Sequence, residues 1–136
     1  MAASSSYLYN HELGYDDDGT AMNSFIESAA MDIGDGDHFT YIRRIIPDLT
    51  FVGSTELSSP QATFTVKSRN FPGADFDNTA SGTTTRTQAS PVETFTDQLH
   101  LRSRGRSFAM RIESNALGAK WKLGSPRVDM KPDGRR

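Results

Sequence analysis

The sequence contains three histidines, the side chains best suited to proton transfer near neutral pH. His11, His38 and His100 stand far apart along the chain, and no nucleophile or acid–base motif surrounds them. His38 opens an expected strand beside a turn, and His100 alternates with Leu99 and Leu101 toward the opposite face. His38 and His100 are therefore interpreted as solvent-facing structural residues. The sequence predicts no catalytic residue and no enzymatic activity.

Carboxylates gather in two short segments that could bind calcium: Asp16, Asp17 and Asp18, and the turn with Asp32, Asp35 and Asp37. Hard cations prefer clustered carboxylates, but neither segment has the spacing of an EF-hand. Aspartates in glycine-containing turns commonly hydrogen-bond their own backbone. The chain also lacks cysteine, which removes disulfides and thiolate metal sites. We therefore predict no metal site and no cofactor.

Charge is strongly segregated along the chain, although the net charge is only -2. Residues 1–42 contain eight acids and no Lys or Arg, whereas residues 102–136 contain ten Lys and Arg against three acids. One end of the chain is therefore anionic and the other cationic. Complementary ends of this kind suit a head-to-tail interface between subunits.

Four arginines form the expected interaction surface, namely Arg102, Arg104, Arg106 and Arg111. They are predicted to share one basic strand face, which could contact phosphate backbones without reading bases. A guanidinium also pairs bidentately with a carboxylate, and the overall acidic chain lacks a base-stacking platform. The favoured hypothesis is an interface with carboxylates of another subunit, such as Asp16, Asp17, Asp18 and Asp35; direct contact with DNA is the weaker alternative.

The elements that must position these residues are expected to be strands. Hydrophobic residues make up 35 % of the 136 residues, and Gly, Ser, Thr, Asp and Asn separate them into short runs. We predict an all-β fold, an antiparallel β-sandwich or jelly-roll-like domain over residues 24–136. Residues 1–23 are predicted to be an extended or flexible N-terminal arm: a frayed terminus if the protein is a monomer, or, if it assembles, a segment whose tyrosines anchor on a neighbouring subunit. No window has the length of a signal peptide's apolar region or of a membrane span, so a soluble product is expected.

Individual strands differ in how clearly the pattern indicates them. Residues 62–69 alternate cleanly between apolar and polar side chains. Residues 24–33 fit a short helix with a capping box as well as a strand, and a strand is favoured because the hairpin-forming residues 34–37 follow. Residues 38–52 predict one bent strand or two strands, since Pro47 interrupts them.

Residues 70–92 predict a long loop, with room for a short polar strand. Further strands are expected at 95–101 and 106–114, followed by short ones around Trp121 and Val128. The predicted core then consists of Phe39, Tyr41, Ile45, Phe64, Val66, Leu99, Leu101, Phe108, Met110, Ile112, Trp121 and Val128.

Eight short segments, spread from about Ser24 to the last residue, together resemble a known family. They are Phe-Ile-Glu-Ser at 25–28, Asp-Ile-Gly-Asp-Gly-Asp-His-Phe at 32–39, Arg-Arg-Ile-Ile-Pro-Asp at 43–48, Arg-Asn-Phe-Pro-Gly at 69–73, Arg-Gly-Arg at 104–106, Arg-Ile-Glu-Ser at 111–114, Trp-Lys-Leu-Gly at 121–124 and Pro-Asp-Gly-Arg-Arg at 132–136. In order and spacing they resemble the C-terminal β module of tail hub proteins of short-tailed bacteriophages, the tail tubular or nozzle type. Those proteins are several times longer, so the expectation is a stand-alone relative.

The resemblance implies a non-enzymatic virion structural protein, a component of a phage tail or neck that is synthesised in the host cytoplasm. Its implied partners are other tail or neck proteins, in a homo-oligomeric ring or docked onto one. Direct DNA contact is not expected, although a position in the tail lumen would allow it. An alternative from another class is a carbohydrate-binding jelly-roll module that presents Trp121 or the arm tyrosines to a glycan.

Overall fold

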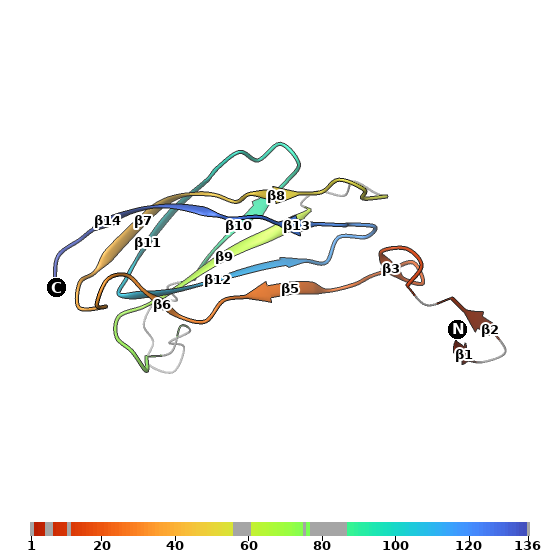
Figure 1. The fold of residues 1–136 in the computed structure, drawn as a ribbon, viewed down its shortest axis with the longest axis horizontal. Coiled ribbons are helices and arrows are strands. Elements are labelled where there is room, and N and C mark those ends of the chain that lie inside the picture. Colours follow the sequence, from red (N-terminus) through yellow and green to blue (C-terminus); the bar gives the residue numbers. More distant parts are fainter. Residues whose placement is uncertain are drawn as a thin grey trace.

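A computed structural model describes residues 2–4, 7–10, 12–55, 61–74, 76 and 87–135 of the chain. These residues form strands and turns and contain no helix, and every strand pairing is antiparallel. The fold class is therefore all-β, as the short apolar runs predicted, and two sheets pack as a sandwich (Figure 1). No described segment is a helix long and apolar enough to cross a bilayer.

The larger sheet has the strand order β10-β9-β12-β5, and β6 pairs with the other half of β12. Its strands are β10 (Thr87–Val92), β9 (Ala62–Arg69), β12 (Ser107–Ser114), β5 (Ser24–Glu27) and β6 (Met31–Asp32). The strand predicted at 24–33 is thus confirmed as two short pieces. β10 is the short strand that the loop prediction for residues 70–92 allowed, while residues 77–86 lie outside the described part of the chain.

The smaller sheet has the order β11-β7-β14. Its strands are β11 (Leu99–Gly105), β7 (Thr40–Ile46) and β14 (Arg127–Pro132). After β7 the chain forms the short β8 (Leu49–Thr50), which pairs with β13 (Lys122–Leu123). Residues 38–52 therefore form two strands separated at Pro47. β11 begins at Leu99 rather than at Phe95, which is 76 % exposed in the preceding loop.

A β-bulge in β7 corrects one member of the predicted core. Against β14, Arg44 pairs with Asp129 and Ile42 with Met130, so that Arg43 is an extra residue of β7; the register of β11 also shifts at this point. The extra residue breaks the alternation, so that Ile42 and Ile45 both point inward. Ile42 is buried in the position expected for Tyr41, and Tyr41 is only partly buried.

The core lies between the two sheets and is built from Ile42, Ile45, Phe51, Ala62, Phe64, Val66, Val92, Leu99, Leu101, Phe108 and Ile112. Phe39 is also buried, as predicted. Met110, Trp121 and Val128 were expected in the core, but they are only partly buried and pack against its margin. All three lie toward the side where β5 and β14 are the outermost strands: Met110 is in β12 next to β5, Val128 is in β14, and Trp121 hydrogen-bonds Ser24 of β5.

The chain turns sharply from the smaller sheet into the larger one between β11 and β12. Only Arg106 separates the two strands, and its backbone N–H donates to the carbonyl of Arg69 in β9 (2.9 Å). A β-carbon at Gly105 would lie 2.9 Å from the same carbonyl oxygen. Glycine is therefore needed here because the corner passes directly against the backbone of β9.

The N-terminal arm extends beyond the sandwich from the first residue of β5 (Figure 1). Its described residues form two small hairpins, β1 (Ala2–Ser4) with β2 (Tyr7–Tyr9) and β3 (Asp16–Asp17) with β4 (Thr20–Ala21). The second hairpin contacts the body of the domain, because the Gly118 N–H donates to Asp16 Oδ1 (2.6 Å). An extended arm is observed; its flexibility stays a prediction.

Candidate functional site

The outer face of the smaller sheet carries a group of positive side chains. In β11, Leu99, Leu101 and Ser103 are buried, so the intervening His100 and Arg102 point outward. The bulge in β7 leaves two successive arginines on this face, where strict alternation would have turned one of them inward. We call the outward side chains Tyr41, Arg43, Arg44, His100 and Arg102 the basic surface.

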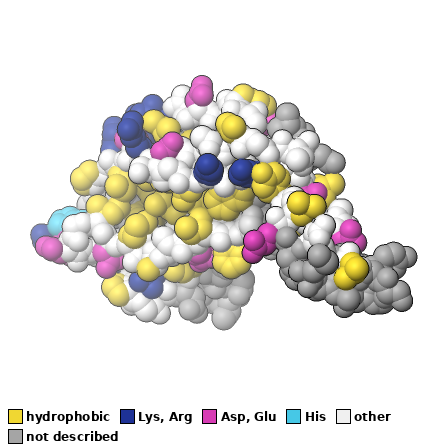
Figure 2. Space-filling view, turned by 45° about the vertical axis from the view of Figure 1, so that its right-hand side comes forward, with side chains coloured by type: hydrophobic (Ala, Val, Ile, Leu, Met, Phe, Trp, Pro, Cys, Tyr) yellow, Lys and Arg dark blue, Asp and Glu magenta, His cyan; other side chains and the backbone are white. Residues whose placement is uncertain are grey.

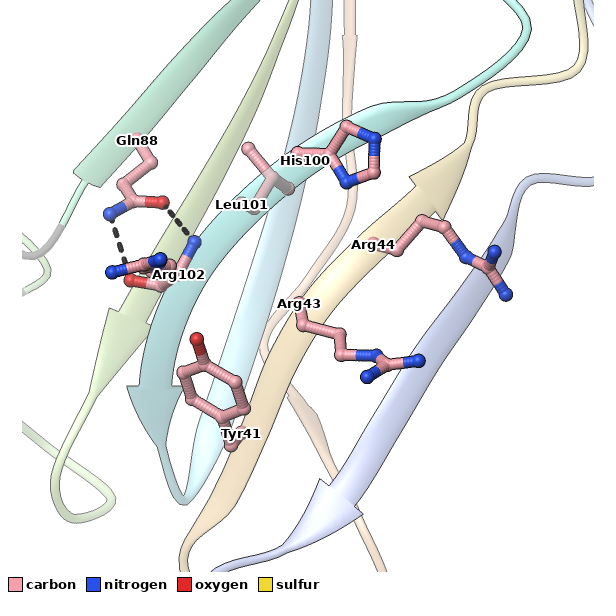
Figure 3. A pocket seen from close by; sticks show the side chains of 7 residues that line it. All are labelled: Tyr41, Arg43, Arg44, Gln88, His100, Leu101 and Arg102. Carbon is pink, nitrogen blue, oxygen red and sulfur yellow. Dashed lines mark hydrogen bonds between the residues drawn. The ribbon is translucent and has the colours of Figure 1, made fainter.

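The basic surface encloses an open hollow of about 900 Å³ (Figure 3). Arg102 lies on the side next to β10, and Arg43 and Arg44 extend toward β14 on the other side (Figure 3). Gln88 of β10 fixes the Arg102 backbone: its Oε1 accepts from the Arg102 N–H (2.7 Å) and its Nε2 donates to the Arg102 carbonyl (2.8 Å). The side-chain amide thus continues the strand ladder across the gap between the two sheets.

Positive charge exceeds negative charge on this surface. Arg43 Nε donates to Asp129 Oδ2 (2.9 Å), and the same oxygen lies 3.6 Å from a terminal nitrogen of Arg44. The hydrogen bond from Arg43, with the charges of Arg43 and Arg44, lowers the pKa of Asp129 below its ordinary value. The Asp129 carboxylate therefore forms ion pairs with two guanidinium groups. Within the described residues, Arg102 forms no ion pair.

Arg104 and Arg106 have structural roles at the corner between the sheets. Both guanidinium groups lie over the ring of Phe39, at 4.0 and 4.5 Å from its centroid. Arg104 also pairs with Asp133, and Arg106 donates to the carbonyls of Asn70 (3.3 Å) and Arg135 (3.0 Å). These two arginines therefore hold the C-terminal segment against the start of β7.

Arg111 does not share a face with the other three arginines, which corrects the prediction of one basic strand face. It lies in β12 of the larger sheet, where it pairs with Glu27 (3.0 Å) and Glu113 (2.8 Å) and covers the Phe25 ring at 3.9 Å. Lys67 pairs with the same Glu27 (2.8 Å). Hydrogen bonds from Lys67 and Arg111 lower the pKa of Glu27, and those to Glu27 and Glu113 raise the pKa of Arg111.

The acidic residues of the predicted interface are mostly solvent-facing. Asp17 and Asp18 are exposed in the arm, and Asp35 is exposed in the turn after β6. Asp16 is partly buried and is already bound to the Gly118 N–H of its own chain. Three of the four carboxylates are thus presented to solvent, and the interface between subunits stays a prediction.

The histidines lie in different surroundings. His38 Nδ1 is 2.5 Å from Asp37 Oδ1, and its Nε2 accepts from Arg135 Nε (3.0 Å). The contact with His38 lowers the pKa of Asp37. His100 lines the hollow, and His11 lies outside the described residues. Among the described side chains, no three His, Asp or Glu gather in a way that could hold a metal ion.

Sequence reasoning missed Tyr41, Arg43 and Arg44 as members of the surface. The available signal was the Arg-Arg pair within an otherwise apolar strand, because two successive charges in a half-buried strand indicate a bulge. Comparison with protein-family models and with curated protein sequences finds no match to this chain. The arrangement itself is suited to binding an anionic partner through several guanidinium groups.

Proposed function

We propose that this chain is a non-enzymatic structural protein of a bacteriophage virion, a component of the tail or neck that assembles with other tail subunits. The observation that supports it best is the placement of opposite charge: the basic surface lies on one sheet, and exposed carboxylates lie on the arm. A subunit with two complementary surfaces can join a second copy head to tail. The resemblance to tail hub proteins gives the same role.

An acidic protein segment is the partner we propose for the basic surface. Arg43 and Arg44 share one carboxylate of Asp129, and Arg44 also donates to Gln98 Oε1 (3.4 Å), which leaves other N–H groups of the two side chains for a second acid. Arg102 lies across the hollow with its side chain exposed. Guanidinium groups bind carboxylates with defined geometry, and Asp17 and Asp18 of another subunit supply two such groups.

The carbohydrate-binding alternative has less support. Where Trp121 is the sugar platform, its ring must be open to a sugar, but Trp121 is partly buried and packs against the core margin. Its indole Nε1–H donates to Ser24 Oγ (2.9 Å), which commits the polar end of the ring to β5. Trp121 is therefore better explained as a structural residue than as a sugar platform.

The test uses charge reversal within the basic surface. Arg44→Glu combined with Arg102→Glu should weaken self-association or binding to tail components by about tenfold or more, because two favourable charges become repulsive. Arg104 and Arg106 are unsuitable for this test, since they support Phe39 and the C-terminal segment. Native mass spectrometry and sedimentation at low and high salt measure the association.

The matched control is Arg44→Lys with Arg102→Lys, which keeps the charge and should retain much of the association. A chain that carries Asp17→Lys and Asp18→Lys should regain part of the binding to the variant with Arg44→Glu and Arg102→Glu. High salt should weaken the wild-type complex, because exposed charges are screened over about 10 Å at ~0.1 M. Wild-type association of the Glu variant, with loss of DNA retention alone, would assign the surface to nucleic acid instead.

A further inference from the structure

Three apolar side chains point toward the interior of the sandwich and yet remain exposed. In the larger sheet, Ile26 lies opposite Ile112 and Met31 lies opposite Phe108, both of which are core residues. In the smaller sheet, Met130 lies opposite the buried Ile42. The side chains of Ile26, Met31 and Met130 are nevertheless 49 %, 40 % and 41 % exposed. Side chains on the inner face of a sheet are normally covered by the opposite sheet.

The cause is that the sandwich is open along one side. On the other side β10 and β11 lie against each other, and Gln88 bridges them through the Arg102 backbone. On the open side the outermost strands are β5 with β6 and β14, and no described strand pairs with their outer edges. Figure 2 shows a continuous band of hydrophobic side chains here, with Lys and Arg side chains adjoining it.

We call this band the open side and define it by Ile26, Met31, Met110, Val128 and Met130. One end of it is closed, because the Trp121 indole donates to Ser24 Oγ across the gap between the sheets. The outer edges of β5, β6 and β14 offer backbone donors and acceptors to an added strand. The open side therefore combines an apolar floor with strand edges, which is the arrangement that binds an extended peptide by strand addition.

We infer that the open side binds the N-terminal arm of a second copy of this chain. The arm extends away from the sandwich and contains strand-forming residues, among them β2 (Figure 1). Its Leu8 and Leu13 are 76 % and 78 % exposed, so these two apolar side chains lack cover in the single chain. Burial of both sets of apolar side chains in one contact would stabilise the complex.

Charge supports the same occupant. The first twenty-three residues contain four acids and no Lys or Arg. Lys122, Arg127 and Lys131 are exposed on β13 and β14, beside the open side. An acidic arm that lies along this edge would therefore contact these three basic side chains as well as the apolar floor, and both contacts would favour binding of the arm.

The arm of the same chain is poorly placed for this role. It leaves the domain at the first residue of β5, and its β3 hairpin is attached outside the sandwich by the Asp16 contact with Gly118. To lie along β14 it would have to reverse its direction and lose that contact. Exchange of arms between copies avoids the reversal and repeats from subunit to subunit. This inference rests on the self-assembly that the proposed function includes.

The test uses the absence of cysteine from the chain. Full-length Leu8→Cys and Met130→Cys are purified separately, mixed, and treated with a short bis-maleimide cross-linker. The expected result is a mixed dimer in yield at least about tenfold above that from Leu8→Cys with Phe95→Cys, because a bound arm holds the two thiols at high effective concentration. Phe95 is a matched exposed residue in the loop between β10 and β11, on the closed side.

Each outcome decides between the alternatives. Equal yields from the two mixtures would overturn the inference, and so would efficient cross-linking within one monomer of a Leu8→Cys, Met130→Cys double variant. Native mass spectrometry of the wild type separates the two proposals: oligomers without selective cross-linking would refute arm docking alone, whereas a monomer at every concentration would also refute self-assembly. Met130→Asp should reduce the oligomer while circular dichroism shows an unchanged fold.

Discussion

The two sides of the sandwich differ in how they end. On the closed side, β10 and β11 meet and the Gln88 amide hydrogen-bonds the backbone of Arg102. On the open side, inward-pointing residues such as Ile26 and Met130 stay exposed, and Trp121 reaches Ser24 at one end only. A side-chain amide therefore completes the closed side where the backbone ladder ends, whereas no described strand pairs with the outer edges of the open side.

The largest expected difference between the sides concerns apolar burial. Leu101→Ala, in β11 on the closed side, should lower the free energy of unfolding by about 2–4 kcal/mol, because it removes a side chain that is 5 % exposed. Met130→Ala on the open side should cost less than about 1 kcal/mol, since much of that side chain already contacts water. Urea unfolding followed by tryptophan fluorescence measures both values. Equal losses would contradict the proposed contrast.

The corner at the end of β11 should be the next most sensitive feature. Gly105→Ala places a β-carbon 2.9 Å from the Arg69 carbonyl oxygen, so the backbone must shift. We expect a loss of about 1–3 kcal/mol, as for other overpacked positions. Gly73→Ala is a control with a different cause, because its φ of +85° is strained but nothing lies within 4 Å of the added carbon. A melting temperature for Gly105→Ala equal to that of the wild type would show that the corner relaxes freely.

The bridge across the closed side should have a smaller effect. Gln88→Ala leaves the Arg102 N–H and carbonyl without their side-chain partner and should cost about 1–2 kcal/mol. Gln88→Glu keeps an acceptor for the N–H but loses the donor for the carbonyl, so it should be intermediate. Hydrogen exchange of the Arg102 amide reports the contact directly, and unchanged protection in Gln88→Ala would refute its role.

The smallest expected effect lies on the outer face of the larger sheet, where charges are balanced within the chain. The pKa of Glu27 is lowered below its ordinary 4.5 by Lys67 and Arg111, so its ion pairs stabilise the fold above that pH. This stabilisation is lost as the pH falls through the lowered pKa of the folded state. Glu27→Gln should therefore cost about 1 kcal/mol or less at neutral pH. The difference from the wild type should disappear in acid, and a constant difference would contradict the assignment.

Much of the strand pattern was predictable because alternation and turn residues are local properties. Residues 62–69 alternate, and they form β9. The failures have local causes that sequence periodicity does not record. Because of the bulge at Arg43, Ile42 lies in the core at the place predicted for Tyr41. The segment around Phe95 is a loop, although its composition resembles that of a strand.

The sequence by itself determined the all-β class, the inward face of most strands and the separation of acidic from basic residues, because each depends on residue type and near-neighbour order. Only the tertiary structure decided which arginines act together. Arg102 and Arg111 are nine positions apart, but the corner at Arg106 places them on different sheets. Arg43 and Arg44 join Arg102 because β7 pairs with β11. Strand pairing between distant segments is a long-range choice, and a local pattern specifies the face of a strand without specifying its neighbour.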